Sequence, residues 1–208
     1  MLFCVCLIVS NLIEIKTVDI GFATITAGMV VFPLSYIIND CIVEVYGFRK
    51  ARTVIWLGFA MNLLVTLFLQ FAILLPGADS WQSQDAMEAV YGTVPRILGA
   101  SFVAFLCGSM VNALVMSKMK VASGGRHFSL RAIVSTLWGE GTDSIIFFPL
   151  AFGGILPWRE IVSLIVAQAL LKTAYEIVIL PVTLKVVKKL KSIESTDTYD
   201  RGISYSWW

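Results

Sequence analysis

Six apolar segments recur along this chain, and they constrain its fold more than any other feature. They cover approximately residues 2–14, 20–39, 53–75, 96–117, 130–155 and 158–184. Five of them reach the roughly 20 residues that an α-helix needs to cross a bilayer, and the first is shorter. Charged residues make up 14% of the chain, whereas a typical soluble domain carries about 25%. We therefore expect an all-α membrane protein with six transmembrane helices, the first of them tilted or in locally thinned membrane.

Basic residues are concentrated in every second connection between these segments and in the C-terminal tail. Of the 16 lysines and arginines, 12 fall in the loop after the second segment, the loop after the fourth, and the C-terminal tail. They are Arg49, Lys50, Arg52, Lys118, Lys120, Arg126, Arg131, Lys185, Lys188, Lys189, Lys191 and Arg201. Because short cytoplasmic loops carry an excess of basic residues, both termini are predicted to be cytoplasmic. We expect a six-helix transmembrane domain over residues 1–190 and a short cytoplasmic tail over 191–208.

Polar residues inside the segments form stripes. Asn62, Thr66 and Gln70 recur at every fourth residue of the third segment, so they share one helix face. Comparable stripes in the next three segments comprise Ser101, Gly108 and Asn112, then Thr136, Glu140 and Asp143, then Gln168, Lys172, Tyr175 and Glu176. One such stripe can simply hold helices together. Four stripes, two of them charged, favour a wet or ligand-filled centre.

The acidic residues of the fifth segment lie deep in the predicted membrane. At about 1.5 Å per residue, Glu140 is about 15 Å from the start of its helix, close to the midplane. Asn62 is similarly deep, and Asp143 and Lys172 lie within about two helical turns of the midplane. Lys172 and Glu176, four residues apart, can neutralise each other. Glu140 and Asp143 then lack an obvious cation, so they either bind protons or meet a ligand that supplies donors or positive charge.

The second segment contains a proline and two acids. Pro33 is expected inside the helix, where it would remove a backbone donor and cause a kink. Asp40 and Glu44 lie four residues apart near the cytoplasmic end. They either pair with Arg49 and Arg52 at the membrane surface or form a cytoplasmic gate.

The tripeptide Phe-Pro-Leu occurs twice, at residues 32–34 and 148–150. The two segments that contain it are predicted to cross the membrane in opposite directions. Many secondary transporters consist of two inverted three-helix halves with interrupted helices near the binding site. The repeat agrees with such an architecture, although a shared tripeptide also arises by chance.

Residue types argue against several classes of function. His127, the single histidine, lies in a basic loop, and the apolar segments contain no nucleophile–base pairing or metal-ligand cluster. Four cysteines lie in or beside apolar runs, which is typical of buried packing thiols: Cys4, Cys6, Cys41 and Cys107. We expect neither an enzyme nor a bound metal or cofactor. The basic tail is interpreted as a cytoplasmic anchor rather than a nucleic-acid or lipid patch, so no nucleic-acid partner is expected.

Two stretches carry a resemblance to a known family. "VFPLSYIINDCIVEVYGFRKAR" at residues 31–52 and "STLWGEGTDSIIF" at residues 135–147 resemble the signatures of the queuosine precursor transporter family, also called the vitamin uptake transporter family. The resemblance extends over nearly the whole chain. It implies a multi-pass protein of a prokaryotic inner membrane that imports 7-cyano-7-deazaguanine and 7-aminomethyl-7-deazaguanine, precursors of a modified tRNA base. The family's acidic residues map onto Asp40, Glu44, Glu140 and Asp143.

Such a ligand suits the acidic residues of the fifth segment. A guanine-like edge presents two adjacent N–H donors, which one carboxylate can accept. Glu140 is therefore predicted as the recognition carboxylate, with Asp143, Asn62 and Gln168 completing the pocket. Further substrate contacts are expected from Asn112, Tyr175 and Trp138, and gating or coupling roles from Asp40, Glu44, Lys172 and Glu176.

A second class of function stays open at this point. The chain has no phosphate-binding glycine loop, so it could also be a membrane subunit that binds a small vitamin-like molecule and works with a separate ATP-driven partner. In both cases the expected partners are a small-molecule substrate and the lipid bilayer. The sequence leaves open whether the chain forms a homodimer and whether protons or sodium ions drive uptake.

Overall fold

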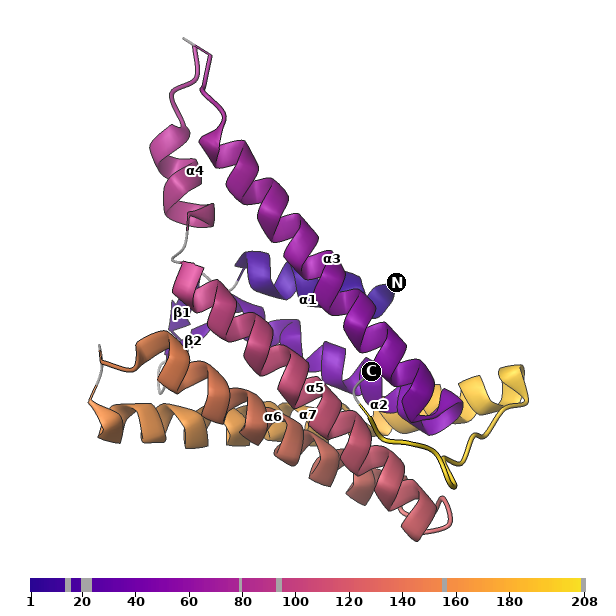
Figure 1. Ribbon diagram of the computed structural model, residues 1–208. Coiled ribbons are helices and arrows are strands. Elements are labelled where there is room, and N and C mark those ends of the chain that lie inside the picture. Colours follow the sequence, from indigo (N-terminus) through magenta and orange to yellow (C-terminus); the bar gives the residue numbers. More distant parts are fainter. Residues whose placement is uncertain (14–15, 20–23, 79, 93–94, 155–156, 207–208) are drawn as a thin grey trace.

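Helices make up most of the chain in the computed structural model, which describes residues 1–13, 16–19, 24–78, 80–92, 95–154 and 157–206 (Figure 1). The helices are α1 (Leu2–Ile13), α2 (Phe32–Tyr46), α3 (Phe48–Leu74), α4 (Gln84–Tyr91), α5 (Pro95–Ala122), α6 (Phe128–Phe152) and α7 (Trp158–Glu194). A 3₁₀ turn, η1 (Ala27–Val30), precedes α2. Two short strands, β1 (Thr17–Asp19) and β2 (Thr24–Thr26), pair antiparallel with Thr17 opposite Thr26.

Four helical stretches of the described chain are long and apolar enough to cross a membrane: Ala27–Tyr46, Phe48–Leu74, Gly99–Ala122 and Trp158–Glu194. The protein is therefore a helical chain with at least these candidate spans. The other two predicted segments also contain helices. However, α1 has 12 residues, and the acids of α6 lower its hydropathy. Six spans remain a prediction.

Several predicted boundaries differ from the structure. The second segment was expected to be helical from residue 20, but residues 24–26 form a strand and the α-helix begins at Phe32. Residues 14, 20–23 and 155 of the predicted segments lie outside the described part of the chain. The last helix was expected to end at residue 184 but continues to Glu194. Residues 185–194 contain no glycine or proline and include four lysines, which favour a helix, so nothing in this stretch ends α7 earlier.

The position of Pro33 is a further correction. Pro33 lies in the first turn of α2, where the missing N–H is not needed, so it begins the helix instead of kinking it. Pro149 lies inside α6, close to its end at Phe152. The two Phe-Pro-Leu tripeptides therefore occupy opposite ends of their helices and are not equivalent positions. Two inverted halves remain a prediction.

α2 is the central helix of the bundle. It packs against α1, α3, α5, α6 and α7, while α5 packs along α6 and α6 along α7. Figure 1 shows α3 and α5 diverging towards the end that carries α4. The core between α1, α2, α3 and α5 is apolar and includes Leu7, Val43, Phe48, Ile55 and Phe105. Exposed apolar side chains such as Phe68 of α3 and Val178 of α7 face outwards, as expected for helices in lipid.

Small residues allow α5 and α6 to approach closely. A Cβ atom added at Gly108 would lie 2.8 Å from the carbonyl oxygen of Gly139 and 2.6 Å from the hydroxyl of Tyr36. A Cβ added at Gly139 would lie 2.7 Å from Cβ of Asn112. Close backbone contact through glycine is typical of packed membrane helices. This contact fixes the position of the acids of α6 relative to α2.

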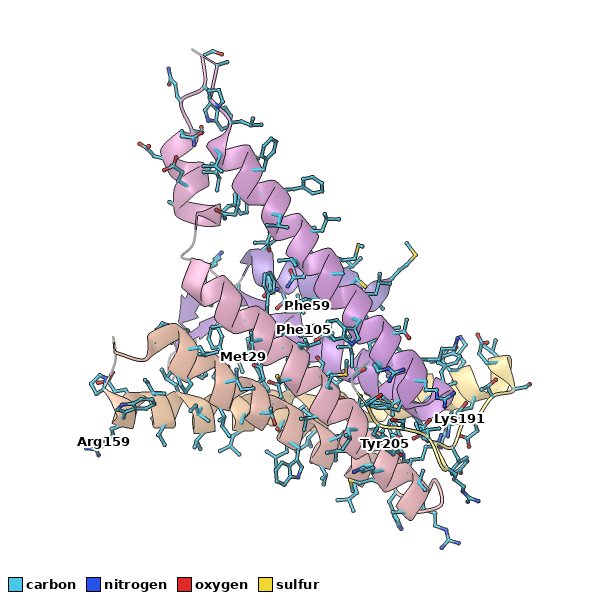
Figure 2. All side chains as sticks on the ribbon, in the orientation of Figure 1. Met29, Phe59, Phe105, Arg159, Lys191 and Tyr205 are labelled. Atoms are coloured by element: carbon cyan, nitrogen blue, oxygen red, sulfur yellow. The ribbon has the colours of Figure 1, made fainter. Side chains whose placement is uncertain are left out.

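One end of the bundle gathers the α2–α3 junction, the α5–α6 junction and the C-terminal tail. Lys191 and Tyr205 lie at this end and Arg159 at the opposite one (Figure 2). Asp200 of the tail accepts hydrogen bonds from the backbone N–H of Phe48 at 2.7 Å and from Ser117 Oγ at 2.5 Å. The predicted basic connections therefore share one end. That this end is cytoplasmic remains a prediction.

Candidate functional site

An acid–lysine cluster lies between α6 and α7. Nζ of Lys172 is 2.8 Å from Oε2 of Glu140 and 3.6 Å from Oδ2 of Asp143. The same ammonium lies 4.2 Å from the ring centroid of Phe32 on α2, a cation–π distance. Glu140 is fully buried and Asp143 is 7% exposed. We call these three ionisable residues the α6–α7 cluster.

This arrangement corrects the pairing considered from the sequence. Lys172 forms its ion pairs with Glu140 and Asp143, and among the described residues it forms none with Glu176. The acids of α6 therefore do have a cation beside them. Intrahelical spacing favoured Glu176, but the packing of α6 on α7 brings two carboxylates to the lysine instead. Because two carboxylates share one lysine, the cluster keeps a formal charge of −1.

A second pair of acids lies between α2 and α7. Asp40 is fully buried, and Ser135 Oγ donates to its two carboxylate oxygens at 3.3 and 3.4 Å. Glu176 is 1% exposed and interacts with Asp40 and with Thr136. Within the described chain, neither acid takes part in an ion pair. The bundle thus buries two carboxyl groups beside each other, and no described residue forms an ion pair with either of them.

Amide side chains connect these acids to α5. Asn39 Nδ2 donates to Asn112 Oδ1 at 2.7 Å, and Asn112 Nδ2 donates to Thr136 Oγ1 at 3.4 Å. The predicted residue Asn112 is therefore buried at the interface of α2, α5 and α6. Asn39 and Tyr36 of this network were not predicted from the sequence. The signal was present, since Tyr36, Asp40 and Glu44 recur at every fourth residue of α2.

Glu44 joins four helices at the end of the bundle that carries the tail. Its carboxylate is 2.5 Å from Arg131 Nη1, 2.6 Å from Lys191 Nζ and 3.8 Å from Lys120 Nζ. Lys120 Nζ also donates to the backbone carbonyl of Glu44. Since α2, α5, α6 and α7 each contribute one of these residues, this Glu44 node ties them together.

Of the two alternatives for Glu44, pairing with Arg49 and Arg52 is therefore wrong. Arg49 is exposed, and Arg52 donates to the backbone carbonyl of Ser206 at 2.7 Å. Arg131, predicted to lie in a loop, is only 1% exposed. The glycine-containing connection before α6 is short, so α6 begins at Phe128 and carries Arg131 into the bundle.

The tail adds an acid to the Glu44 node. Asp197 Oδ1 lies 2.5 Å from Lys120 Nζ and 2.9 Å from Lys191 Nζ. Burial alone would raise the pKa of Asp197, but the hydrogen bonds and charges of the two lysines outweigh it and hold this pKa below its usual value. The tail residue is therefore a charged partner of the node.

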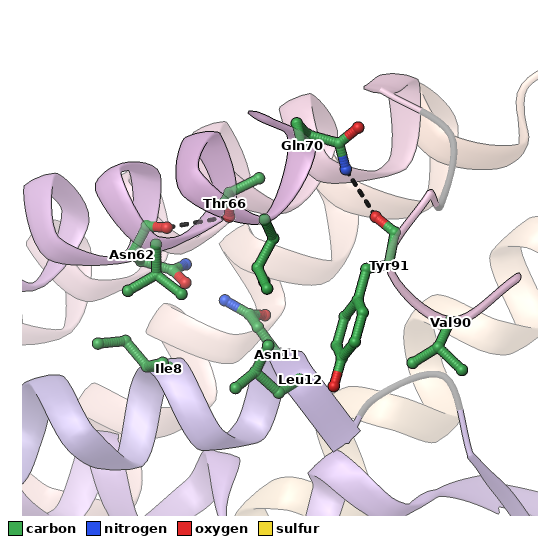
Figure 3. A pocket seen from close by; sticks show the side chains of 10 residues that line it. Ile8, Asn11, Leu12, Asn62, Thr66, Gln70, Val90 and Tyr91 are labelled. Carbon is green, nitrogen blue, oxygen red and sulfur yellow. Dashed lines mark hydrogen bonds between the residues drawn. The ribbon is translucent and has the colours of Figure 1, made fainter. Parts of the chain in front are cut away.

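Asn62 lies away from the acids, in a small cavity between α1, α3 and α4. Figure 3 shows this cavity with Asn11, Thr66 and Tyr91 in its wall. The space open to the centre of a water-sized sphere is about 40 Å³, enough for water but far below the roughly 300 Å³ of a typical ligand pocket. Asn62 is buried and its Nδ2 has no hydrogen-bond partner among the described residues. The structure does not bring Asn62 to Glu140.

The other predicted contact residues are spread over α6 and α7. Trp138 is 62% exposed, so it lies on the outer face of α6. Tyr175 Oη donates to the backbone carbonyl of Val30 at 3.2 Å, which ties α7 to the turn before α2. Gln168 is half-buried one turn before Lys172. Their contacts with a substrate remain predictions.

Helices long enough to cross a bilayer indicate an integral membrane protein, and charged residues buried between such helices are typical of solute and ion pathways. Residues 26–186 match the family model described as "Putative vitamin uptake transporter". The chain therefore belongs to this family, which is a family of transporters and not of enzymes.

Curated relatives agree with this membership. The chain is 32% identical over 173 residues to the probable queuosine precursor transporter of Bacillus subtilis, covering 83% of this chain and 76% of the relative. It is 29% identical over 149 residues to the queuosine precursor transporter of Escherichia coli, covering 72% of this chain and 62% of the relative. The probable queuosine precursor transporter of Haemophilus influenzae is 24% identical over 127 residues, which is 61% of this chain and 52% of that relative. No solved structure was found to match the chain.

Proposed function

We propose that this protein imports queuosine precursors across the inner membrane of a prokaryotic cell, through a central polar path that includes the α6–α7 cluster. The observation that carries the proposal is its family membership, together with relatives named for this transport. The buried acids supply a place where a polar base could bind inside a bilayer.

Glu140 suits the recognition of a guanine-like edge. Neither oxygen of this carboxylate has a hydrogen-bond donor in suitable geometry among the described residues, although Oε2 lies 2.8 Å from Nζ of Lys172. A 7-deazaguanine base carries a ring N–H and an exocyclic amine side by side, and a carboxylate can accept both. The ammonium of the aminomethyl precursor can additionally replace Lys172 as the counter-charge of Asp143.

Substrate access requires the helices to move. Glu140 is fully buried and the cluster is enclosed by α2, α5 and α7 in this conformation. Secondary carriers expose such a central site alternately to the two sides of the membrane. The Glu44 node and the tail close one end of the bundle, so we assign to Glu44 the gating role at that end.

Uptake by the purified protein in liposomes tests the proposal. We expect accumulation of labelled 7-cyano-7-deazaguanine or 7-aminomethyl-7-deazaguanine, with weaker competition by adenine than by guanine. Glu140→Gln should lower uptake about tenfold or more, because a hydrogen bond to a charged group contributes about 1.5–3 kcal/mol. The control is Glu160→Gln, an exposed glutamate in the first turn of α7. Near-normal uptake by Glu140→Gln at equal protein density would refute the role of Glu140.

The same measurement separates the carrier from the alternative of a binding subunit. Uptake by the purified chain alone needs no ATP-driven partner. If the chain binds a precursor but does not move it until an ATPase is added, the protein is a binding subunit instead.

A further inference from the structure

Asp40 and Glu176 form a buried acid pair that the recognition of a base does not use. They come from α2 and α7, which pack against each other. Asp40 is fully buried and Glu176 is 1% exposed. Neither carboxylate oxygen of Glu176 has a hydrogen-bond donor in suitable geometry within the described chain. A charged carboxylate in this position would lack both a cation and a full set of donors.

The charges around the pair increase this cost. Tyr36 and Cys41 of α2 and Glu140 of α6 interact electrostatically with the pair, and none of them supplies a positive charge. The described side chains of α5 and α6 in contact are the neutral groups of Asn112, Ser135 and Thr136. Lys172 lies one turn before Glu176 on α7, but its ion pairs are with the acids of α6.

Two adjacent carboxylates in a low-dielectric interior repel each other, and desolvation disfavours both charges. One bound proton removes the repulsion and provides the missing donor, because a protonated carboxyl can donate to its neighbour. A metal ion is a poor alternative, since the described residues contain no cluster of three or more histidine, cysteine or acidic ligands.

We propose that Asp40 and Glu176 form a proton-binding site in which the two carboxyl groups share one proton, and that this proton is the ion coupled to transport. The proton comes from water on one side of the membrane, binds to the carboxylate pair, and returns to water on the other side. The acid pair and the α6–α7 cluster together contain four acids and one lysine. Binding of one proton changes their combined formal charge from −3 to −2. Proton binding rests on the burial and contacts of the two acids, whereas coupling rests on the proposed function.

The position of the pair relative to the substrate site allows coupling. Glu176 lies one turn after Lys172, and Glu140 interacts electrostatically with both residues. A proton on the pair reduces the negative potential at Glu140, so the two sites influence each other directly. Movement of α7 relative to α2 would expose the pair and the cluster together.

Infrared spectroscopy of the purified protein in lipid tests proton binding without any substrate. At neutral pH we expect the carbonyl band of a protonated carboxyl group, shifted in heavy water. The double variant Asp40→Asn/Glu176→Gln should lose this band, and Glu140→Gln should keep it. Absence of the band in the wild type overturns the proposal, as does its loss in Glu140→Gln alone.

Liposome transport then tests coupling separately from substrate recognition. An inward proton gradient should stimulate precursor uptake by the wild type, and precursor entry should acidify the lumen. Asp40→Asn and Glu176→Gln should still exchange labelled for unlabelled precursor but should no longer respond to the gradient. Exchange of precursor tests the proposed function, and thermal stabilisation by precursor shows that a variant is folded and binds the precursor. Wild-type uptake that depends on sodium and ignores the proton gradient would overturn the coupling.

Discussion

Lys172 of α7 lies 2.8 Å from Glu140 of α6, so the lysine neutralises an acid on the neighbouring helix and not the glutamate one turn along its own. This relationship makes the ion pair a contact between helices. It also means that a rearrangement of α6 against α7 must break or exchange the pair. Under the proposed function, the same two side chains would affect both the stability of the bundle and transport.

The Lys172–Glu140 pair can be measured with a double-mutant cycle. Lys172→Met leaves two buried carboxylates without their cation, and breaking a buried pair in this way costs about 3–5 kcal/mol of unfolding free energy. Adding Glu140→Leu should restore part of this loss, with a coupling energy of about 0.5–3 kcal/mol in mixed-micelle unfolding. Lys188→Met, at an exposed position of α7, serves as the control. Strictly additive effects would show that the two residues do not interact.

The Glu44 node should be critical for the stability of the bundle. Glu44→Gln leaves Arg131 buried without its counter-charge, so we expect a loss of about 3–5 kcal/mol in the free energy of unfolding. Glu160→Gln removes the same charge from an exposed site and should change stability by about 1 kcal/mol or less. Thermal denaturation of both variants in detergent provides the comparison. Equal stability of the two variants would contradict the role assigned to the node.

Two glycines of α6 offer a matched test of helix packing. Gly139→Ala places a methyl group 2.7 Å from Cβ of Asn112 and 2.8 Å from the ring of Tyr36, so the helices must separate at a cost of about 1–3 kcal/mol. Gly141→Ala meets no atom within 4 Å. Because alanine favours a helix over glycine, this second change should be neutral or add about 1 kcal/mol of stability. If both substitutions have the same sign, the close approach of α5 and α6 is wrong.

Asp200 should stabilise the start of α3 from a distant part of the sequence. Its carboxylate accepts the N–H of Phe48, the first residue of that helix. Removing a helix N-terminal cap costs about 0.5–2 kcal/mol, and Asp200→Ala also leaves Ser117 without its acceptor. Asp85→Ala, in the exposed first turn of α4, is the control. Hydrogen exchange should show faster exchange at the start of α3 in Asp200→Ala but not in Asp85→Ala.

The helical character of the chain was predictable because long apolar segments leave few alternatives to membrane helices. The position of the basic connections at one end was also predictable, because consecutive helices that alternate in direction place every second connection at the same end. The short strands and α4 were not predicted, since they lie in connections where apolar periodicity gives no signal. The end of α7 was placed too early because the rule for bilayer length says nothing about a helix that continues beyond its apolar part.

Within the site, helix faces were predictable but their neighbours were not. The stripe that includes Asn62 does occupy one face of α3, yet that face meets α1 and α4 instead of α6. Spacing along α7 likewise suggested Glu176 as the partner of Lys172, whereas packing selected Glu140. A polar stripe shows which residues share one helix face. Only the packing of the helices shows which residues that face contacts.

The docking of the tail also affects the order in which the protein is assembled. The cap of α3 and one counter-charge of Lys120 come from Asp200 and Asp197, more than 70 residues later than their partners. These contacts cannot form during synthesis of the first helices. The end of the bundle that carries the Glu44 node therefore acquires its final structure only after residues 197–200 have left the ribosome.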